Sequence, residues 1–410
     1  MKGRDVLQIS LGVLTAIGGF LDVGATATAG EAGAKFGLGL VWAVVLGTIA
    51  IILLLMMVGK FTAVTKKPYA AAIREHFGFK FYLVPLTAEL LANSVMLAAE
   101  LGGMAIALSL LTGISWHLLF PVAALGVVVM AWRAPFKVIE NGPAILGLVT
   151  LCFVAAIFAL GGPGKDLLPT LWKPPVTAQK SVDYFFLVAA ILGAIISPYL
   201  IYFYSSGARE EKWSRGSLHV NKVTAIVGMT FGGVVAVALI VVAAVVLGPQ
   251  HIEAGTLGEI GLALVKPWGS VGAVLFALSL LIACYGAALE IVLAVPYELA
   301  QGFGWEFGKD KRPAQAPRFN LAIVLFMVVA VAIGLIGVDP LQLTLYGSAF
   351  TALVLPISLS PVLLIMNDRD YMGNQTNSRW MNVATVAILV IAGLVSLVTL
   401  PLTLASGGGQ

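Results

Sequence analysis

Two stretches decide the fold of this chain: GGFLDVGATATAGEAG at residues 18–33 and GAIISPYLIYFYSSG at residues 193–207. Each lies inside a long apolar segment and carries residues that interrupt a helix. The first holds a carboxylate, Asp22, in a run of Gly and Thr, which have poor helix propensity. The second holds Pro198 in mid-segment, and proline removes a hydrogen bond from a helix interior. We therefore predict that both segments are broken helices.

The composition is that of a polytopic membrane protein. Of 410 residues, 60% are hydrophobic and 11% are charged, and the mean hydropathy is +0.99. These values exclude a soluble protein. One spanning helix needs roughly 20 apolar residues, so the chain has room for about eleven or twelve. The net charge of +4 comes from basic residues in short runs between apolar segments, a pattern that indicates membrane topology and argues against a nucleic-acid partner.

Eleven apolar segments are predicted to span the membrane. With the N-terminus inside, the cytoplasmic segments hold 19 of the 24 Lys and Arg residues and the other side holds 5. The positive-inside rule then predicts a cytoplasmic N-terminus and an outside C-terminus. The segments lie at about 7–32, 37–59, 82–112, 116–133, 141–162, 182–206, 221–247, 268–298, 319–336, 339–366 and 380–403.

The order of these segments fits a common transporter plan of five plus five inverted helices with one helix added. We predict an all-α fold in a single transmembrane domain, with LeuT-type inverted repeats at about 7–162 and 182–366 and an additional helix at about 380–403. In this plan the first helix of each half is broken at the membrane centre, beside the substrate. Residues 163–181, with four prolines, are predicted to form an irregular lid outside the membrane.

Further motifs accompany the two breaks. The chain resembles the NRAMP family of proton-coupled divalent-metal transporters along nearly its whole length. The Asp-Pro-Gly-Asn motif of that family is similar to DVGA at residues 22–25, followed by a similar Phe-Gly and Leu-x-Trp pattern at residues 36–42. Its third span is similar to AAELGGMAIALSLLTGI, which places the family glutamate at Glu100. Its signature before the last span is close to DRDYMGNQTNSRW at residues 368–380.

The site chemistry departs from the family pattern, although Asp22 is retained. The Met-Pro-His motif of the family corresponds to SPY at residues 197–199, so a hydroxyl replaces a soft thioether. The family asparagine of span 1 corresponds to Ala25, which removes an amide oxygen. Hard oxygen donors in an incomplete shell suit Mg²⁺, which dehydrates reluctantly. The chain resembles a divergent, magnesium-transporting branch of the superfamily in this respect.

The candidate ion-binding residues are those of the two breaks. A carboxylate at the bilayer centre is costly and normally faces a cavity or a partner, so Asp22 and Ser197 are the predicted metal ligands. The structural alternative is that Asp22 holds the break by a hydrogen bond and that Ser197 packs between helices. The full set is Asp22, Gly24, Ala25, Thr26, Ser197, Pro198 and Tyr199, with Thr28 as a further hydroxyl and with Glu100, Tyr204 and Glu290 as candidate relay or gating residues.

The positions of the histidines argue against strict proton coupling. The two family histidines of the sixth span correspond to Tyr199 and Tyr204, and the family aspartate of the third span corresponds to Leu97. A tyrosine with a pKa near 10 does not exchange protons near neutral pH as histidine does. The four histidines of the chain lie in or beside predicted loops: His76, His117, His219 and His251.

Three classes of function are consistent with these residues. The first is a secondary transporter or facilitator of a divalent cation, with Mg²⁺ favoured over Mn²⁺. The second is a transporter of an organic solute such as an amino acid, which the tyrosines around residues 199–204 would suit. The third is a non-transporting sensor.

Enzyme activity and a cofactor are not expected, because no Ser/His/Asp, HExxH or phosphate-loop pattern occurs. The expected partners are a divalent metal ion and the lipid bilayer, with no obligate protein partner. A chain without targeting extensions favours the bacterial inner membrane.

Overall fold

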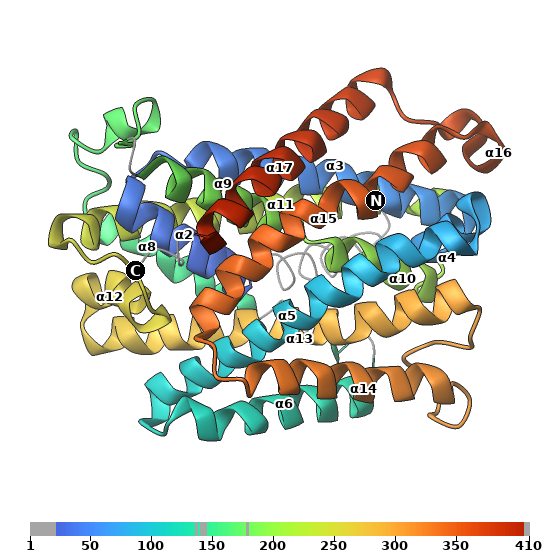
Figure 1. Ribbon diagram of the computed structural model, residues 1–410, viewed down its shortest axis with the longest axis horizontal. Coiled ribbons are helices and arrows are strands. Elements are labelled where there is room, and N and C mark those ends of the chain that lie inside the picture. The colour runs from blue at the N-terminus through green and yellow to red at the C-terminus, as the bar shows by residue number, and fades with distance from the viewer. Residues whose placement is uncertain (1–21, 136–137, 140–145, 178–179, 406–410) are drawn as a thin grey trace.

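The computed structural model describes residues 22–135, 138–139, 146–177 and 180–405. Within these ranges all regular structure is helical, as predicted (Figure 1). Residues 1–21 lie outside the described part of the chain, and with them the first half of the predicted span at 7–32. The C-terminal residues 406–410 also lie outside it.

Nine helical segments of the described chain are long and apolar enough to cross a membrane, and they match nine of the eleven predicted spans. The other two predicted spans are described in part: α2 (Val23–Phe36) is the second half of 7–32, and η1 with α8 (Gly147–Ala159) lies within 141–162. The total of eleven therefore stays a prediction. The nine segments are α3 (Val41–Thr65), α5 (Phe79–Thr112), α6 (Trp116–Arg133), α9 with α10 (Ser181–Glu210), Arg215–Gln250 around α11 (Leu218–Val246), α13 (Ser270–Phe303), α14 (Pro317–Gly334), α15 (Pro340–Asn367) and Arg379–Leu402 of α17 (Arg379–Ala405).

The α9–α10 segment lies at the centre of the bundle. In its most apolar 18-residue stretch, 94% is buried inside the protein. The corresponding share is 28% for α6 and 33% for α14 and α17. The rim helices leave large apolar side chains exposed, as helices that face lipid do. In Figure 1, α6 and α14 run side by side along one edge, next to α5 and α13, and α17 lies on the opposite edge against α9 and α15. The central position of α9 and α10 places their break inside the protein.

The break between α9 and α10 is the one predicted from Pro198. Helix α9 (Ser181–Ile195) ends before Ile196, and α10 (Pro198–Glu210) begins with Pro198 in its first turn. Proline is well suited to a first helical position, because its missing N–H would have no partner there. Ser197 between the two helices is extended, with φ −74° and ψ 117°. The chain therefore leaves helical geometry at Ile196, with φ −93° and ψ 59°, and resumes it at Pro198.

Three further α-helices of the described chain lie outside the predicted spans. Helix α12 (Leu257–Trp268) follows α11 and begins with a reciprocal cap between Thr256 and Glu259, and α4 (Tyr69–Phe77) connects α3 to α5. The Thr-x-x-Glu spacing is a helix-start signal that the hydropathy pattern does not show. The short helix α16 (Arg369–Met372) precedes α17.

Over residues 163–177, the predicted lid after α8 is irregular apart from the short helix η2 (Leu168–Leu171). It lies on the turn between α2 and α3, where the Leu38 amide donates to Thr170 Oγ1 over 2.9 Å. A β-carbon at Gly39 would lie 2.5 Å from Pro174 Cβ, so the lid fits closely over this turn.

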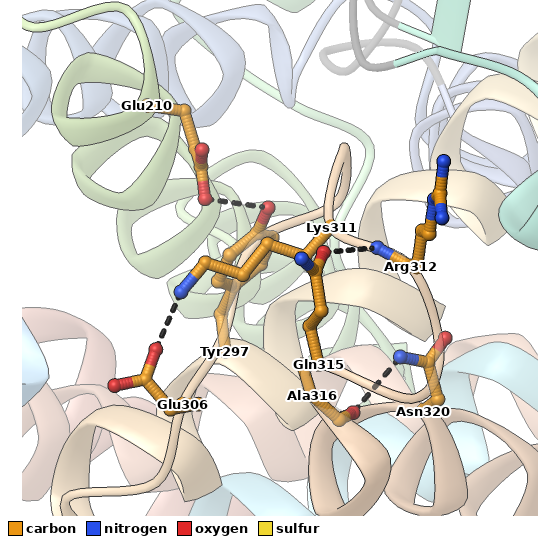
Figure 2. Close-up of polar contacts among 8 residues, drawn as sticks. All are labelled: Glu210, Tyr297, Glu306, Lys311, Arg312, Gln315, Ala316 and Asn320. Carbon is orange, nitrogen blue, oxygen red and sulfur yellow. Dashed lines mark hydrogen bonds and ion pairs between the residues drawn. The ribbon is translucent and has the colours of Figure 1, made fainter.

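At the opposite end of the bundle, the loop after α13 and the end of α10 are held together by hydrogen bonds (Figure 2). The Tyr297 hydroxyl accepts from the Lys309 amide over 3.1 Å and donates to Glu210 Oε1 over 3.3 Å. In the same loop Lys311 pairs with Glu306, and this ammonium lowers the pKa of the exposed Glu306 carboxyl. Tyr297 thus ties α10 to α13 at the end that the charge pattern predicts to be cytoplasmic.

Candidate functional site

Asp22 is the N-cap of α2, directly at the start of the helix. Its Oδ1 accepts the Ala25 amide over 2.6 Å, and its backbone carbonyl accepts the Thr26 amide over 3.1 Å. A side-chain oxygen that satisfies a free amide of the first turn is typical of an N-cap and contributes about 1 kcal/mol. The side chain is buried. Asp22 therefore has the structural role of a helix cap. This role uses one of its two carboxylate oxygens.

The second oxygen of Asp22 faces the broken helix formed by α9 and α10. Tyr199 of α10 places its hydroxyl 3.5 Å from Asp22 Oδ2, at the outer limit of a hydrogen bond. Tyr199 is buried, and it follows the break at Ser197 by two residues. The structure therefore brings the start of α2 and the break before α10 together, with a carboxylate from one and a phenol from the other. The predicted break of the first span depends on residues before Asp22, which lie outside the described part of the chain.

Glu100 joins the same site from α5. Both of its carboxylate oxygens lie 3.3 Å from the Val23 amide, the first amide of α2. Glu100 is fully buried and close enough to Asp22 for the two charges to interact. The partial positive charge of a helix N-terminus favours nearby anions. When both are ionised, two carboxylates at one helix start nevertheless repel each other, and a cation between them would offset that repulsion.

Ser197 keeps an acceptor available at the break. Its hydroxyl donates to the Ala194 carbonyl over 2.7 Å, so the hydrogen is used while the oxygen retains lone pairs. The side chain is buried beside Tyr199. Ser197 can therefore present a hard oxygen to a cation without losing its present hydrogen bond.

Ser348 of α15 is a site residue that the sequence did not single out. A β-carbon at Gly24 would lie 2.9 Å from Ser348 Oγ, so this hydroxyl stands directly against the first turn of α2. Its hydroxyl donates to Met96 Sδ of α5 over 4.0 Å. The available signal was a hydroxyl within an apolar helix, but α15 carries several, and no pattern distinguishes this one.

The remaining predicted residues have more local roles. Thr28 donates to the Gly24 carbonyl over 2.8 Å, within its own helix. Tyr204 donates to Asn221 Oδ1 of α11 over 2.9 Å, about 7 Å beyond Tyr199 along α10. Glu290 of α13 is near enough to Tyr199 for an electrostatic interaction. Ala25 and Thr26 are buried in the first turn of α2, and Pro198 starts α10.

The site is poor in the usual transition-metal ligands. Over the described ranges, no three His, Cys, Asp or Glu residues come together as a metal-binding group. The site instead combines two carboxylates, hydroxyls and the open backbone of the break. Oxygen donors of this kind suit hard cations that keep some of their water.

A broken helix, α9 with α10, that meets the start of α2 around buried carboxylates inside an apolar bundle defines a membrane transporter of the broken-helix class. The chain belongs to the Nramp family, because the family model "Natural resistance-associated macrophage protein-like" matches residues 12–401. The resemblance inferred from the motifs is thereby confirmed. This is a family of transporters, so the chain is not expected to act as an enzyme and needs no cofactor.

Known proteins agree with this assignment. The chain is 28% identical over 392 residues to "Divalent metal cation transporter MntH" of Klebsiella pneumoniae subsp. pneumoniae, covering 91% of this chain and 89% of the relative. The fold is similar to that of the Eremococcus coleocola manganese transporter, with a TM-score of 0.77 and 22% identity over 98% of this chain and 88% of the other.

The LeuT-type arrangement is supported by a more distant structure. MhsT in complex with L-phenylalanine matches with a TM-score of 0.64 and 15% identity, covering 95% of this chain and 97% of the other. At this identity the similarity concerns the fold alone. It confirms the predicted class of fold.

Proposed function

We propose that this protein is a secondary transporter or facilitator of a divalent cation, which binds where the start of α2 meets the break before α10. The observation that carries the proposal is the pair of buried carboxylates, Asp22 and Glu100, at one helix start. Intramembrane carboxylates of this kind mark ion pathways in transporters. The relatives named as divalent metal cation and manganese transporters support the same class of substrate.

We favour Mg²⁺ as the transported ion. Ser197 takes the place of the family thioether, and Ser348 adds a second hydroxyl from α15. Ala25 offers no side-chain oxygen. A cation bound here would keep part of its hydration shell, as Mg²⁺ usually does in proteins.

Mn²⁺ is the second candidate, and one observation favours it. Met96 of α5 places its sulfur 4.0 Å from Ser348 Oγ, beside the first turn of α2. A thioether near the site is a softer donor than the hydroxyls. If Met96 contacts the ion, Met96→Leu lowers Mn²⁺ affinity more than Mg²⁺ affinity, whereas both are unchanged if the ion is bound by oxygens alone.

An organic substrate is the less favoured alternative. The solved structure of MhsT, named with L-phenylalanine, shares the fold. The site of this chain, however, pairs two buried carboxylates, which oppose a substrate carboxylate and favour a cation. Tyr199 directs its hydroxyl toward Asp22 and does not stand apart as the wall of an organic pocket.

We further propose that transport is not strictly proton-coupled. All four histidines lie within the described ranges, and the hydrogen bonds of Asp22 and Glu100 involve none of them. An inside-negative membrane supplies about 2.3 kcal/mol per charge per 100 mV, so uptake of a divalent ion needs no proton gradient. We place the protein in a bacterial inner membrane, with the N-terminus in the cytoplasm and one domain of two inverted repeats.

Transport into proteoliposomes tests this function. Vesicles containing the protein and a Mg²⁺-sensitive dye should take up Mg²⁺ when a potassium gradient makes the interior negative. An Asp22→Asn protein provides the inactive control. Uptake of an amino acid without uptake of Mg²⁺ or Mn²⁺ would replace this proposal with the organic-solute alternative.

A further inference from the structure

A second pair of buried carboxylates lies away from the central site. Glu89 of α5 and Glu298 of α13 are 0% and 1% exposed, and they are close enough for their charges to interact. Glu89 precedes Glu100 by eleven residues in the same helix, a separation of about 16 Å along the axis. Glu298 lies five residues before the end of α13. The pair is therefore displaced from Asp22 toward the end of the bundle that carries the loop after α13.

Hydrogen bonds satisfy only part of this cluster. Asn93 Nδ2 donates to Glu89 Oε2 over 3.2 Å. Tyr82 donates to the backbone carbonyl of Glu298 over 2.6 Å, and Tyr69 donates to the carbonyl of Ser358 over 2.8 Å. These contacts fix the surrounding helices, but none of them reaches the Glu298 carboxylate.

Four buried oxygen atoms of the cluster have no hydrogen-bond partner among the described residues. They are Glu89 Oε1, Glu298 Oε1, the Tyr202 hydroxyl and Ser358 Oγ. Tyr202 interacts electrostatically with Glu298, and Ser358 lies beside Glu89 without hydrogen-bond geometry. Tyr202 is 2% exposed and Ser358 is 0% exposed. Buried polar atoms are nearly always paired, so a cluster of unpaired oxygens indicates a missing partner.

The chemistry of these atoms suits a cation. All four are oxygens, and two belong to acids that repel each other when both are ionised. None of the ion pairs found in the described part of the chain involves Glu89 or Glu298. Carboxylate and hydroxyl oxygens are the donors that hard divalent cations prefer.

We propose that Glu89 and Glu298 form a second divalent-cation site, with Tyr202 and Ser358 as additional oxygen donors. An ion that leaves the central site would bind here before it reaches the end of the bundle near α4. The ring centroid of Tyr69, from α4, lies 5.1 Å from that of Tyr202. This inference rests on the proposed function, because it requires a chain that carries a divalent cation.

Counting bound Mn²⁺ by electron paramagnetic resonance tests the second site. The probe is Mn²⁺ alone, added to the full-length protein in detergent, and the loss of the free-ion signal gives the number of bound ions. The wild-type protein should bind two ions. The Asp22→Asn variant should bind one ion, and so should the double variant with Glu89→Gln and Glu298→Gln. A variant with all three changes should bind none.

A matched control and single variants make the count decisive. Glu306→Gln removes an exposed carboxylate from the loop after α13 and should bind two ions, as the wild type does. Gel filtration and thermal melting show whether the double variant folds. If it does not, Glu298→Gln alone should weaken Mn²⁺ binding at the second site at least tenfold.

Several results would overturn the second site. One ion in the wild type, lost in Asp22→Asn and retained in the double variant, would remove it and leave the proposed function intact. A changed number of released protons with unchanged Mn²⁺ binding would make the pair a proton site only. No bound Mn²⁺ or Mg²⁺ in the wild type would contradict the proposed function itself.

Discussion

Asp22 and Glu100 meet at the first turn of α2, where Asp22 Oδ1 accepts the Ala25 amide at 2.6 Å and Glu100 accepts the Val23 amide at 3.3 Å. One helix start is therefore shared by two carboxylates from different helices. Each carboxylate uses backbone amides for part of its hydrogen-bonding capacity. The remaining capacity is available to a cation, whose charge would offset the repulsion between the two carboxylates when both are ionised.

The first prediction concerns Ser197. Ser197→Met should raise binding of Mn²⁺ or Cd²⁺ relative to Mg²⁺, because a thioether replaces a hydroxyl at the break. We expect a relative change of about tenfold, equal to about 1.4 kcal/mol. Calorimetric titration with each ion measures it. Ser197→Ala is the matched control, which should weaken Mg²⁺ binding without favouring Mn²⁺, and an unchanged preference in Ser197→Met would show that residue 197 does not contact the ion.

The second prediction concerns the contact between α9 and α15. A β-carbon at Gly193 would lie 1.8 Å from the Ser348 carbonyl oxygen, so the two helices approach through backbone atoms. Gly193→Ala should destabilise the protein by about 1–3 kcal/mol, because packed helices cannot accept the added methyl without moving.

Thermal melting in detergent measures this effect. Gly126→Ala in α6 is the control, since a β-carbon there meets no atom within 4 Å, and alanine in a helix interior should stabilise by about 0.5–1 kcal/mol. Equal melting temperatures for the two variants would argue against the close approach of α9 and α15.

The third prediction concerns proton coupling. Proteoliposomes with an internal pH dye should show no lasting acidification during Mg²⁺ uptake when the voltage is clamped, because no histidine is hydrogen-bonded to Asp22 or Glu100. The Glu100→Gln variant should likewise show no lasting acidification. Acidification that persists in the wild type and disappears in Glu100→Gln would show that Glu100 carries a coupled proton.

The fourth prediction concerns topology. Single cysteines at Lys173 and Lys311, in a protein without Cys152 and Cys284, should react with an impermeant reagent from opposite sides of the membrane, because the basic residues gather on one side. Lys173 lies in the lid after α8 and Lys311 in the loop of Figure 2. Reaction of both from the same side would require a different number of spans.

Much of the fold could be predicted from the sequence because hydropathy and helix breakers act locally. The apolar runs predicted all nine spanning segments, and Pro198 located the break between α9 and α10. Helices α4 and α12 were missed, since neither is long enough to give a membrane signal. The cap between Thr256 and Glu259 was the available signal for α12.

The site was only partly predictable, because it depends on which helix faces meet. The motifs indicated Asp22, Glu100 and Tyr199, and the structure brings these three together. Ser348 and Met96 come from helices whose rotation the sequence does not define. The pairing of Glu89 with Glu298 likewise depends on the contact between α5 and α13, which spacing along the chain cannot reveal.

The central claim is that Asp22 anchors a divalent cation, and Mg²⁺ binding to Asp22→Asn tests it most directly. Asparagine is as good an N-cap as aspartate, so α2 should keep its start while the site loses a charge. Isothermal titration calorimetry, with Mn²⁺ and an amino-acid panel beside Mg²⁺, should show binding by the wild type and at least a hundredfold loss, about 2.7 kcal/mol, in the variant. Mg²⁺ and Mn²⁺ affinities that are the same in both proteins would contradict the account.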